Sequence, residues 1–264
     1  MVVEAQRSND AGFTTKEREL LKSKLNKPLD VKIEDGIEIA TGEVVVDVDY
    51  DGERYHDPRP YPIEIRFEPD ENAIQLPKVF TKDDRIRNFH ISNGRTESEE
   101  IHVYGDGLMC LDTPQVAAEC FSDGFKGDVF YDKFLIKALF WQSFFERHGH
   151  EPFESWGHFL AGKLEYYGVK RELDAIRIAN DMKKYTSNQE KLDIKKLMSK
   201  RKGISRNQVC LCGSGDPIRD CHPDAFTALV TIQKHTRLLT KKQRLHFWHN
   251  EFGIEQQVLK RQRL

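Results

Sequence analysis

The sequence lacks any long uninterrupted hydrophobic run. No apolar stretch approaches the roughly 20 residues that a helix needs to cross a bilayer, which argues against an integral membrane protein. The N-terminal segment also lacks the apolar core of a signal peptide. Together these two absences predict a soluble, cytoplasmic protein with no membrane partner.

Cysteine is scarce, and internal repeats are absent. The chain of 264 residues has 5 cysteines, an odd number that does not suit a complete set of disulfides. In a chain without an export signal, such cysteines are expected to be free thiols or metal ligands. Three of them lie close together near the C-terminal end, and Cys110 and Cys120 lie in the middle of the chain.

A net charge of only −2 conceals a strong asymmetry along the chain. After residue 182 there are 18 Lys and Arg residues against 7 Asp and Glu, and before it there are 23 against 36. The first part therefore carries a net charge of −13 and the remainder +11. This pattern predicts an acidic body followed by a basic tail.

The N-terminal region shows a clear helix start signal. Residues 1–13 are mostly polar and are expected to be disordered. Thr14 and Glu17 then form a capping box ahead of a run of leucines. We therefore expect a short amphipathic helix over residues 15–25.

Alternating apolar and polar residues follow this helix and predict strands. The alternation covers residues 37–39, 44–50 and 61–67, and residues 74–80 form a further extended segment. The proline-rich stretch 57–60 is typical of a turn between strands. One helix followed by meandering antiparallel strands indicates an α+β fold.

Helical patterns dominate the second half of the chain. After an aperiodic stretch over residues 81–114, we expect helices over residues 115–121, 129–145, 155–167, 172–185 and 225–252. The expected organisation is an α+β domain with a helical extension over residues 14–182, a basic linker over 183–207, and a small C-terminal module over 208–264.

The C-terminal module contains a dense cluster of potential metal ligands. The three thiols and one imidazole are Cys210, Cys212, Cys221 and His222, a set that suits a tetrahedral zinc ion. The run resembles the SEC-C motif, a small zinc-binding module appended to many bacterial proteins. That resemblance implies that these four residues are the zinc ligands. Four protein ligands leave no position for a reacting water, so the zinc is expected to be structural.

Cys110 differs in its surroundings from Cys120. Cys120 lies in a predicted helix, where a buried and inert thiol is expected. Cys110 ends an irregular stretch that contains Gly105 and Gly107, directly before that helix. We expect such a thiol to be accessible, and a nearby imidazole or helix terminus would favour its thiolate.

The order of segments around Cys110 resembles the ubiquitin-conjugating (UBC) fold, most closely its divergent bacterial members. A helix precedes strands with YPIEIRFEP at 61–69 and LPKVF at 76–80, and His102 precedes the run GLMCL at 107–111. The resemblance covers about residues 14–150 and implies an antiparallel sheet with flanking helices.

The same resemblance implies an activity. A partner activating enzyme would deliver a ubiquitin-like protein to Cys110, which would carry it as a thioester and pass it to an amine on a protein target. Bacterial relatives belong to antiphage defence operons, so antiviral defence is the expected setting.

The site departs from the family pattern at one position. Tyr104 stands where the family usually has an Asn that stabilises the oxyanion; a tyrosine hydroxyl can donate to an oxyanion, and Asn93 is a second candidate. His102 is interpreted either as a residue that holds the loop or as a general base. Asp112 either orients or deprotonates the incoming amine, or it is a solvated loop or cap residue.

Two other functions stay open from the sequence. A UBC-type domain without its Asn can act as a non-catalytic adaptor that binds a protein partner. The basic tail can also bind nucleic acid through phosphate contacts, although aromatic residues that would stack on bases are few there. A solvated basic face, or contact with an acidic partner, is the simpler interpretation of the tail.

Overall fold

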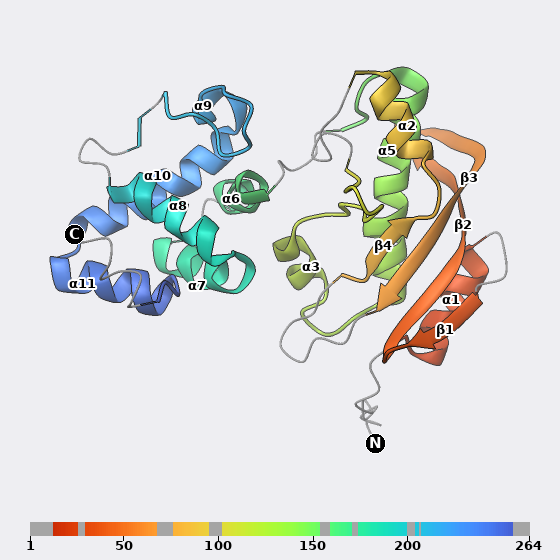
Figure 1. Cartoon of the computed structure of the whole chain (residues 1–264), viewed down its shortest axis with the longest axis horizontal. Helices are drawn as coiled ribbons and strands as arrows, with labels where there is room; N and C mark the ends of the chain where they lie inside the picture. Colours follow the sequence, from red (N-terminus) through yellow and green to blue (C-terminus); the bar gives the residue numbers. More distant parts are fainter. Residues whose placement is uncertain are drawn as a thin grey trace. The chain divides into compact units, whose positions relative to one another are not determined.

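The computed structural model divides the chain into two compact units (Figure 1). It describes residues 13–25, 30–67, 76–94, 102–153, 159–170, 174–199, 204–205 and 207–255. Unit 1 comprises Met1–Asp112 and Ala117–Glu154, and unit 2 comprises Thr113–Val116 and Ser155–Leu264. Each unit has its own architecture.

Unit 1 begins with helix α1, Thr15–Lys24, which confirms the helix expected from the capping box. Thr14 donates its backbone N–H to Glu17 Oε2 at 2.7 Å, and Glu17 donates its own to Thr14 Oγ1 at 3.3 Å. Phe13 lies in the segment expected to be disordered, but it is buried and donates its N–H to Glu38 at 2.8 Å. The other residues of that segment lie outside the described part of the chain.

Four antiparallel strands in the order β1-β2-β3-β4 form the sheet of unit 1. They are β1, Asp30–Glu34; β2, Ile37–Tyr50; β3, Glu53–Phe67; and β4, Lys78–Thr81. The expected antiparallel meander and the α+β class are confirmed. The two alternating segments 37–39 and 44–50 belong to the single strand β2.

Asp-Gly pairs make the turns of the first two hairpins. Asp35 and Gly36 have φ angles of 52° and 81°, and Asp51 and Gly52 have 52° and 82°. Left-handed backbone at both central residues is what a two-residue type I′ turn requires, and glycine adopts it without a steric penalty.

The proline-rich stretch 57–60 is not the turn that its composition suggests. It lies inside β3, where the register with β2 shifts between the pairs Val44↔Tyr61 and Val46↔Asp57. Proline cannot donate to the ladder and is tolerated at such an irregularity. The β-bulge therefore accommodates both prolines without ending the strand.

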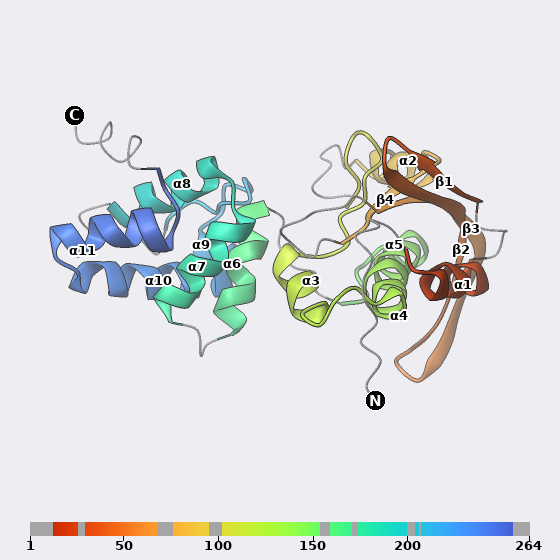
Figure 2. The ribbon, with the colours of Figure 1, turned by 90° about the horizontal axis from the view of Figure 1, so that it is seen from below.

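Helices follow the sheet, and one of them packs across it. They are α2, Arg85–Ser92; α3, Pro114–Cys120; α4, Gly127–Val129; the π-helix η1, Phe130–Leu135; and α5, Ile136–His148. α5 crosses one face of the sheet (Figures 1 and 2), where Phe140 lies 4.9 Å from Tyr50 and 5.1 Å from Tyr55 between ring centroids. The aromatic stripe of η1 and α5 is thus core, as its periodicity predicts.

The described part of unit 2 consists of a short loop before α9 and of helices arranged around α10. They are α6, Phe159–Val169; α7, Ala175–Tyr185; α8, Asn188–Ser199; α9, Ile218–Cys221; α10, Pro223–Leu238; α11, Lys241–His246; and the π-helix η2, Phe247–Glu251. Buried residues from α6, α7, α8, α10 and η2 form one hydrophobic cluster.

The unit boundary differs from the expected domain boundary. α6 and α7 belong to unit 2 rather than to a 14–182 domain, because they bury their apolar sides against α10. Most of the described part of the expected linker 183–207 is helix α8, whose Ile194 is fully buried. Periodicity identified the α6 and α7 helices but could not tell which core each one joins.

The helix expected over residues 225–252 is interrupted. α10 ends at Leu238, and Thr240 begins α11 with a capping box to Gln243. Because the cap supplies a new helix start, the chain turns there and returns Phe247 and Trp248 to the same core.

Candidate functional site

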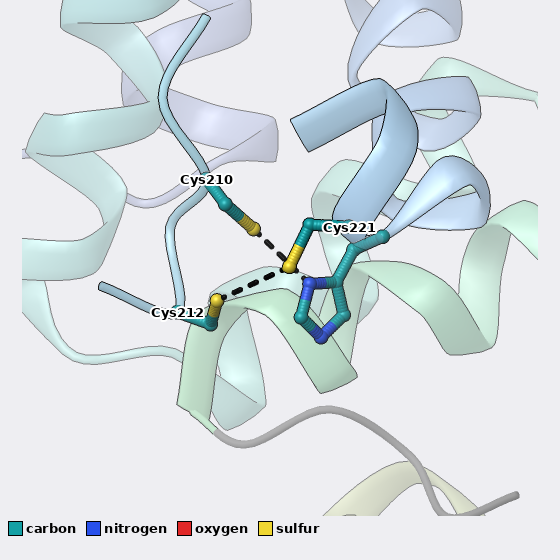
Figure 3. Close-up of side chains that lie close together, drawn as sticks. Cys210, Cys212 and Cys221 are labelled. Atoms are coloured by element: carbon teal, nitrogen blue, oxygen red, sulfur yellow. Dashed lines mark hydrogen bonds between the residues drawn. The ribbon is translucent and has the colours of Figure 1, made fainter. Parts of the chain in front are cut away.

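A short loop before α9 gathers three thiols (Figure 3). The loop folds back on itself through the bridge Val209↔Pro217, and Cys210 donates its N–H to Asp216 O at 2.8 Å. Cys210 and Cys212 come from this loop and Cys221 ends α9, so that the sulfurs point toward one another. The glycines between them adopt left-handed backbone, with φ of 87° at both Gly213 and Gly215.

His222 completes the cluster from the position between α9 and α10. Its Nδ1 lies 3.1 Å from Cys210 Sγ, and Cys212 Sγ lies 3.6 Å from Cys221 Sγ. One ligand atom from each of the four residues lies within 4.8 Å of the others. This arrangement can hold a metal ion, and it brings together all four residues that the spacing singled out.

The electrostatics of the cluster favour a cation. Burial raises the pKa of the Cys210 thiol to about 12. Burial also acts against the Cys212 thiolate, but hydrogen bonds from Ser214 outweigh it and lower the Cys212 pKa. Ionised thiols this close together repel one another, and a bound cation would stabilise them all as thiolates.

Cys110 ends a short antiparallel ribbon formed by residues 102–110, rather than an irregular loop. Val103 pairs with Met109, and Cys110 donates its N–H to the carbonyl of His102 at 2.8 Å. Met109 donates to Val79 O on β4 at 2.7 Å, which ties the ribbon to the sheet. The position of the thiol is therefore set by the sheet.

The structure does not support the expected activation of the Cys110 thiol. Its side chain is only partly accessible, and burial raises the pKa of the thiol to about 11, with the Asp112 carboxylate acting in the same direction. The expectation of a favoured thiolate is therefore wrong for the isolated chain. A thiol in this environment is a weak nucleophile at neutral pH.

His102 holds the ribbon through its backbone and its ring. It adopts left-handed backbone with φ 53°, an uncommon conformation for a residue other than glycine. Its carbonyl accepts the Cys110 N–H, and its ring lies 4.7 Å from that of Trp141 on α5. These contacts favour the loop-holding interpretation of His102.

Tyr104 lies at the neck of the turn that closes the ribbon. Its N–H donates to Leu108 O at 2.8 Å, and its carbonyl accepts from Gly107 at 2.9 Å. The residue lines a hollow of about 200 Å³ together with Lys82 and Arg87. Tyr104 and Cys110 are thus carried on one ribbon.

The side chains of Asn93 and Asp112 make contacts that differ from the roles expected of them. The Asn93 side chain donates to Phe89 O at 2.8 Å and so caps the end of α2. Asp112 is not a solvated loop residue, since its side chain is only 4% exposed and lies 3.4 Å from Lys137 Nζ on α5. The Asp112–Lys137 pair therefore sets the charge beside Cys110.

No family model, curated protein or solved structure matches this chain. The described helices include none with the length and apolar character that a bilayer crossing requires. The residues of each candidate site, and the contacts within that site, thus carry the functional argument.

Lys137 is a site residue that sequence reasoning missed. It lies on α5, far along the chain from Asp112, and its ammonium compensates the carboxylate beside the thiol. A lysine on the polar side of a predicted helix gives no local signal of such a role, because the pairing depends on how α5 packs.

Proposed function

We propose that Cys110 carries a ubiquitin-like protein as a thioester, as in the ubiquitin-conjugating family. The observation that carries the proposal is the position of Cys110. It ends a ribbon that is tied to β4, the last strand of the sheet. This ribbon comes after an N-terminal helix and a four-strand antiparallel meander, which is the order expected of a UBC-type domain.

The chemistry is acyl transfer in two steps. The Cys110 thiolate attacks the C-terminal carbonyl carbon of a modifier held as a thioester on an activating enzyme; a new S–C bond forms and the enzyme's thiolate leaves. A target amine then attacks the same carbon, an amide forms, and Cys110 is released as a thiolate. The proton that the amine loses is taken up by the released Cys110 thiolate, which regenerates the thiol, so atoms and charge balance.

The raised thiol pKa makes Cys110 a slow nucleophile and a poor leaving group. It therefore slows hydrolysis of the thioester and also its transfer to an amine. The same property requires a partner that supplies an activated acyl group. Tyr104 is the candidate donor to the oxyanion on transfer, and Asp112 is the candidate for orienting the amine.

Unit 2 supports a second, independent proposal, that its metal is a structural zinc. In a tetrahedral zinc site with Zn–S bonds of about 2.3 Å, neighbouring sulfurs lie about 3.8 Å apart. The 3.6 Å between Cys212 and Cys221 fits this value, and the His222 Nδ1 to Cys210 distance of 3.1 Å needs only a small expansion. With four protein ligands, the zinc would supply folding energy rather than chemistry.

The test of the thioester is co-expression of the full chain with the proteins encoded beside it, followed by non-reducing gels and intact mass analysis. We expect an adduct that thiol reductant removes, and a reductant-resistant oxyester in Cys110→Ser. Cys110→Ala should give no adduct, and Cys120→Ser should behave as the wild type. Adducts that persist in Cys110→Ala would overturn the proposal.

The second candidate function is a non-catalytic protein adaptor. It is favoured by Tyr104 in the place of the usual Asn, together with the partly buried thiol of Cys110. If the neighbouring proteins load one another while Cys110 stays unmodified, and Cys110→Ala retains biological activity, the adaptor is the better description.

A further inference from the structure

The imidazole of His222 has a second polar neighbour besides the thiols. Its Nδ1 faces Cys210, so the metal would bind at Nδ1 and leave Nε2 on the opposite edge of the ring. Glu165 Oε1 lies 4.0 Å from that Nε2, and the two side chains are only 16% and 14% exposed. A carboxylate is thus placed at the free nitrogen of the histidine ligand.

The packing of α6 on α10 holds Glu165 in this position. Glu165 lies on α6, three residues before Gly168. A Cβ added at Gly168 would lie 1.9 Å from the carbonyl oxygen of Asp224 on α10. Only glycine permits this approach, which brings α6 against the start of α10 directly after His222.

We propose that Glu165 is a positioning residue for the metal centre, accepting the Nε2–H of His222 once Nδ1 binds the metal. This inference rests on the metal site proposed above. The present 4.0 Å separation exceeds a hydrogen bond. A small side-chain movement closes it, and metal binding makes the imidazole N–H a stronger donor.

The carboxylate has two effects on the site. It fixes the His222 tautomer and ring orientation, and it raises the basicity of the ligating nitrogen; loss of such a partner typically costs 10- to 100-fold in metal affinity. It also connects the cluster to α6, so metal binding would order a helix that contributes no ligand.

A second His–Glu pair in unit 2 provides a matched control. His246 and Glu251 lie 3.8 Å apart, but their side chains are 62% and 30% exposed, and neither belongs to the cluster. The two pairs share residue types and separation and differ in burial and in contact with the cluster. Only Glu165 should affect the metal.

The first experiment measures zinc affinity of the full chain by competition with a chromophoric chelator. We expect Glu165→Gln, which keeps the size and removes the charge, to bind zinc at least 10-fold more weakly than wild type, and Glu251→Gln to bind within 2-fold of it. Equal affinity of Glu165→Gln and wild type would overturn the role of Glu165 while leaving the metal site intact. A wild-type chain that binds no zinc would instead overturn the site itself.

The second experiment separates positioning from a general loss of folding. Far-UV circular dichroism at saturating zinc establishes that Glu165→Gln is folded. Long-range ¹H–¹⁵N spectra of the zinc-loaded chain should then show His222 as the Nε2–H tautomer, with a slowly exchanging proton in wild type and a rapidly exchanging one in Glu165→Gln. An Nδ1–H tautomer in the loaded wild type would contradict the proposal.

Discussion

Each unit contains one polar cluster that matters for its stability, and the two clusters are built differently. In unit 1, Asp57 is completely buried and receives hydrogen bonds from Arg59, Arg85 and Ser143, all within the chain. In unit 2, the cluster before α10 consists of three thiols and an imidazole, which lack a cation among themselves. The Asp57 network is therefore sensitive to pH, whereas the metal site proposed for unit 2 would make the stability of that unit depend on a metal from solution.

The units differ in charge as well. Residues 155–264 hold 22 Lys and Arg against 11 Asp and Glu, a net of +11, while the rest of the chain holds 19 against 32, a net of −13. The asymmetry seen along the sequence therefore coincides with the structural division. An acidic α+β unit and a basic helical unit are expected to attract different partners.

Removing the metal should have the largest effect, and only on unit 2. At a free zinc concentration about 1,000-fold above Kd, binding stabilises the folded state by about 4 kcal/mol, and a chelator or Cys212→Ser removes this contribution. Hydrogen exchange with mass spectrometry should show faster exchange over residues 207–238 and unchanged exchange in β2 and β3. Equal acceleration in both units would contradict separate stabilisation; Cys120→Ser is the control.

The buried Asp57 carboxylate and the two arginines that bind it, Arg59 and Arg85, form a charge network in unit 1. Breaking this network should destabilise unit 1 by an amount comparable to that of metal removal in unit 2. Asp57→Ala leaves Arg85, whose side chain is 18% exposed, without one of its two carboxylate partners. Removal of one partner from a buried ion pair typically costs 3–5 kcal/mol. Urea unfolding of unit 1, followed by hydrogen exchange of the amides in β2 and β3, measures this loss of stability. The urea midpoint of unit 2 should stay at its wild-type value.

Acid should weaken the same network. Burial acts against the Asp57 carboxylate, but hydrogen bonds from Arg59, Ser143 and Arg85 outweigh it and hold its pKa below the unfolded value. A depressed folded-state pKa gives stability that is present above the unfolded pKa of about 4 and is lost as pH falls further. The urea midpoint of unit 1 should therefore decrease as the pH is lowered below about 4, and it should decrease less in Asp57→Ala.

The Cys110 thiol should react slowly, in contrast to an exposed thiol. Its pKa of about 11, against an ordinary value of 9.0, lowers the thiolate fraction at neutral pH roughly 100-fold. Alkylation of Cys110, quantified by peptide mass spectrometry, should accelerate up to about pH 11 and be faster in Asp112→Asn, which removes the adjacent negative charge. A rate that levels off below pH 9 would show an activated thiol.

Local signals in the sequence predicted much of the fold. The capping box of Thr14 and Glu17 and the alternation in 61–67 act between neighbouring residues, and both elements are present. Helix α2 was missed because it is short and buries only Ile86 and His90, which gives little periodicity. The stretch 57–60 was misread because its bulge depends on pairing with β2.

The two candidate sites also differ in how far they could be predicted from neighbouring residues alone. The metal cluster was predictable because its four ligands lie close in sequence and their spacing reflects one chemistry. The environment of Cys110 was not, because its burial and the Asp112–Lys137 pair depend on segments that pack only in the folded unit. The role inferred for Glu165 is likewise a product of helix packing.

The smallest effect is expected from an exposed ion pair in unit 1, and it tests whether burial is what makes the Asp57 network matter. Arg54 donates to Asp47 Oδ1 at 2.7 Å, with geometry as good as that around Asp57, but the two side chains are 72% and 36% exposed. Water and salt screen such a pair, so Asp47→Ala should leave the urea midpoint of unit 1 unchanged. If Asp47→Ala and Asp57→Ala destabilise the unit equally, then contact geometry rather than burial governs these pairs, and the contrast with the metal site proposed for unit 2 has to be explained in another way.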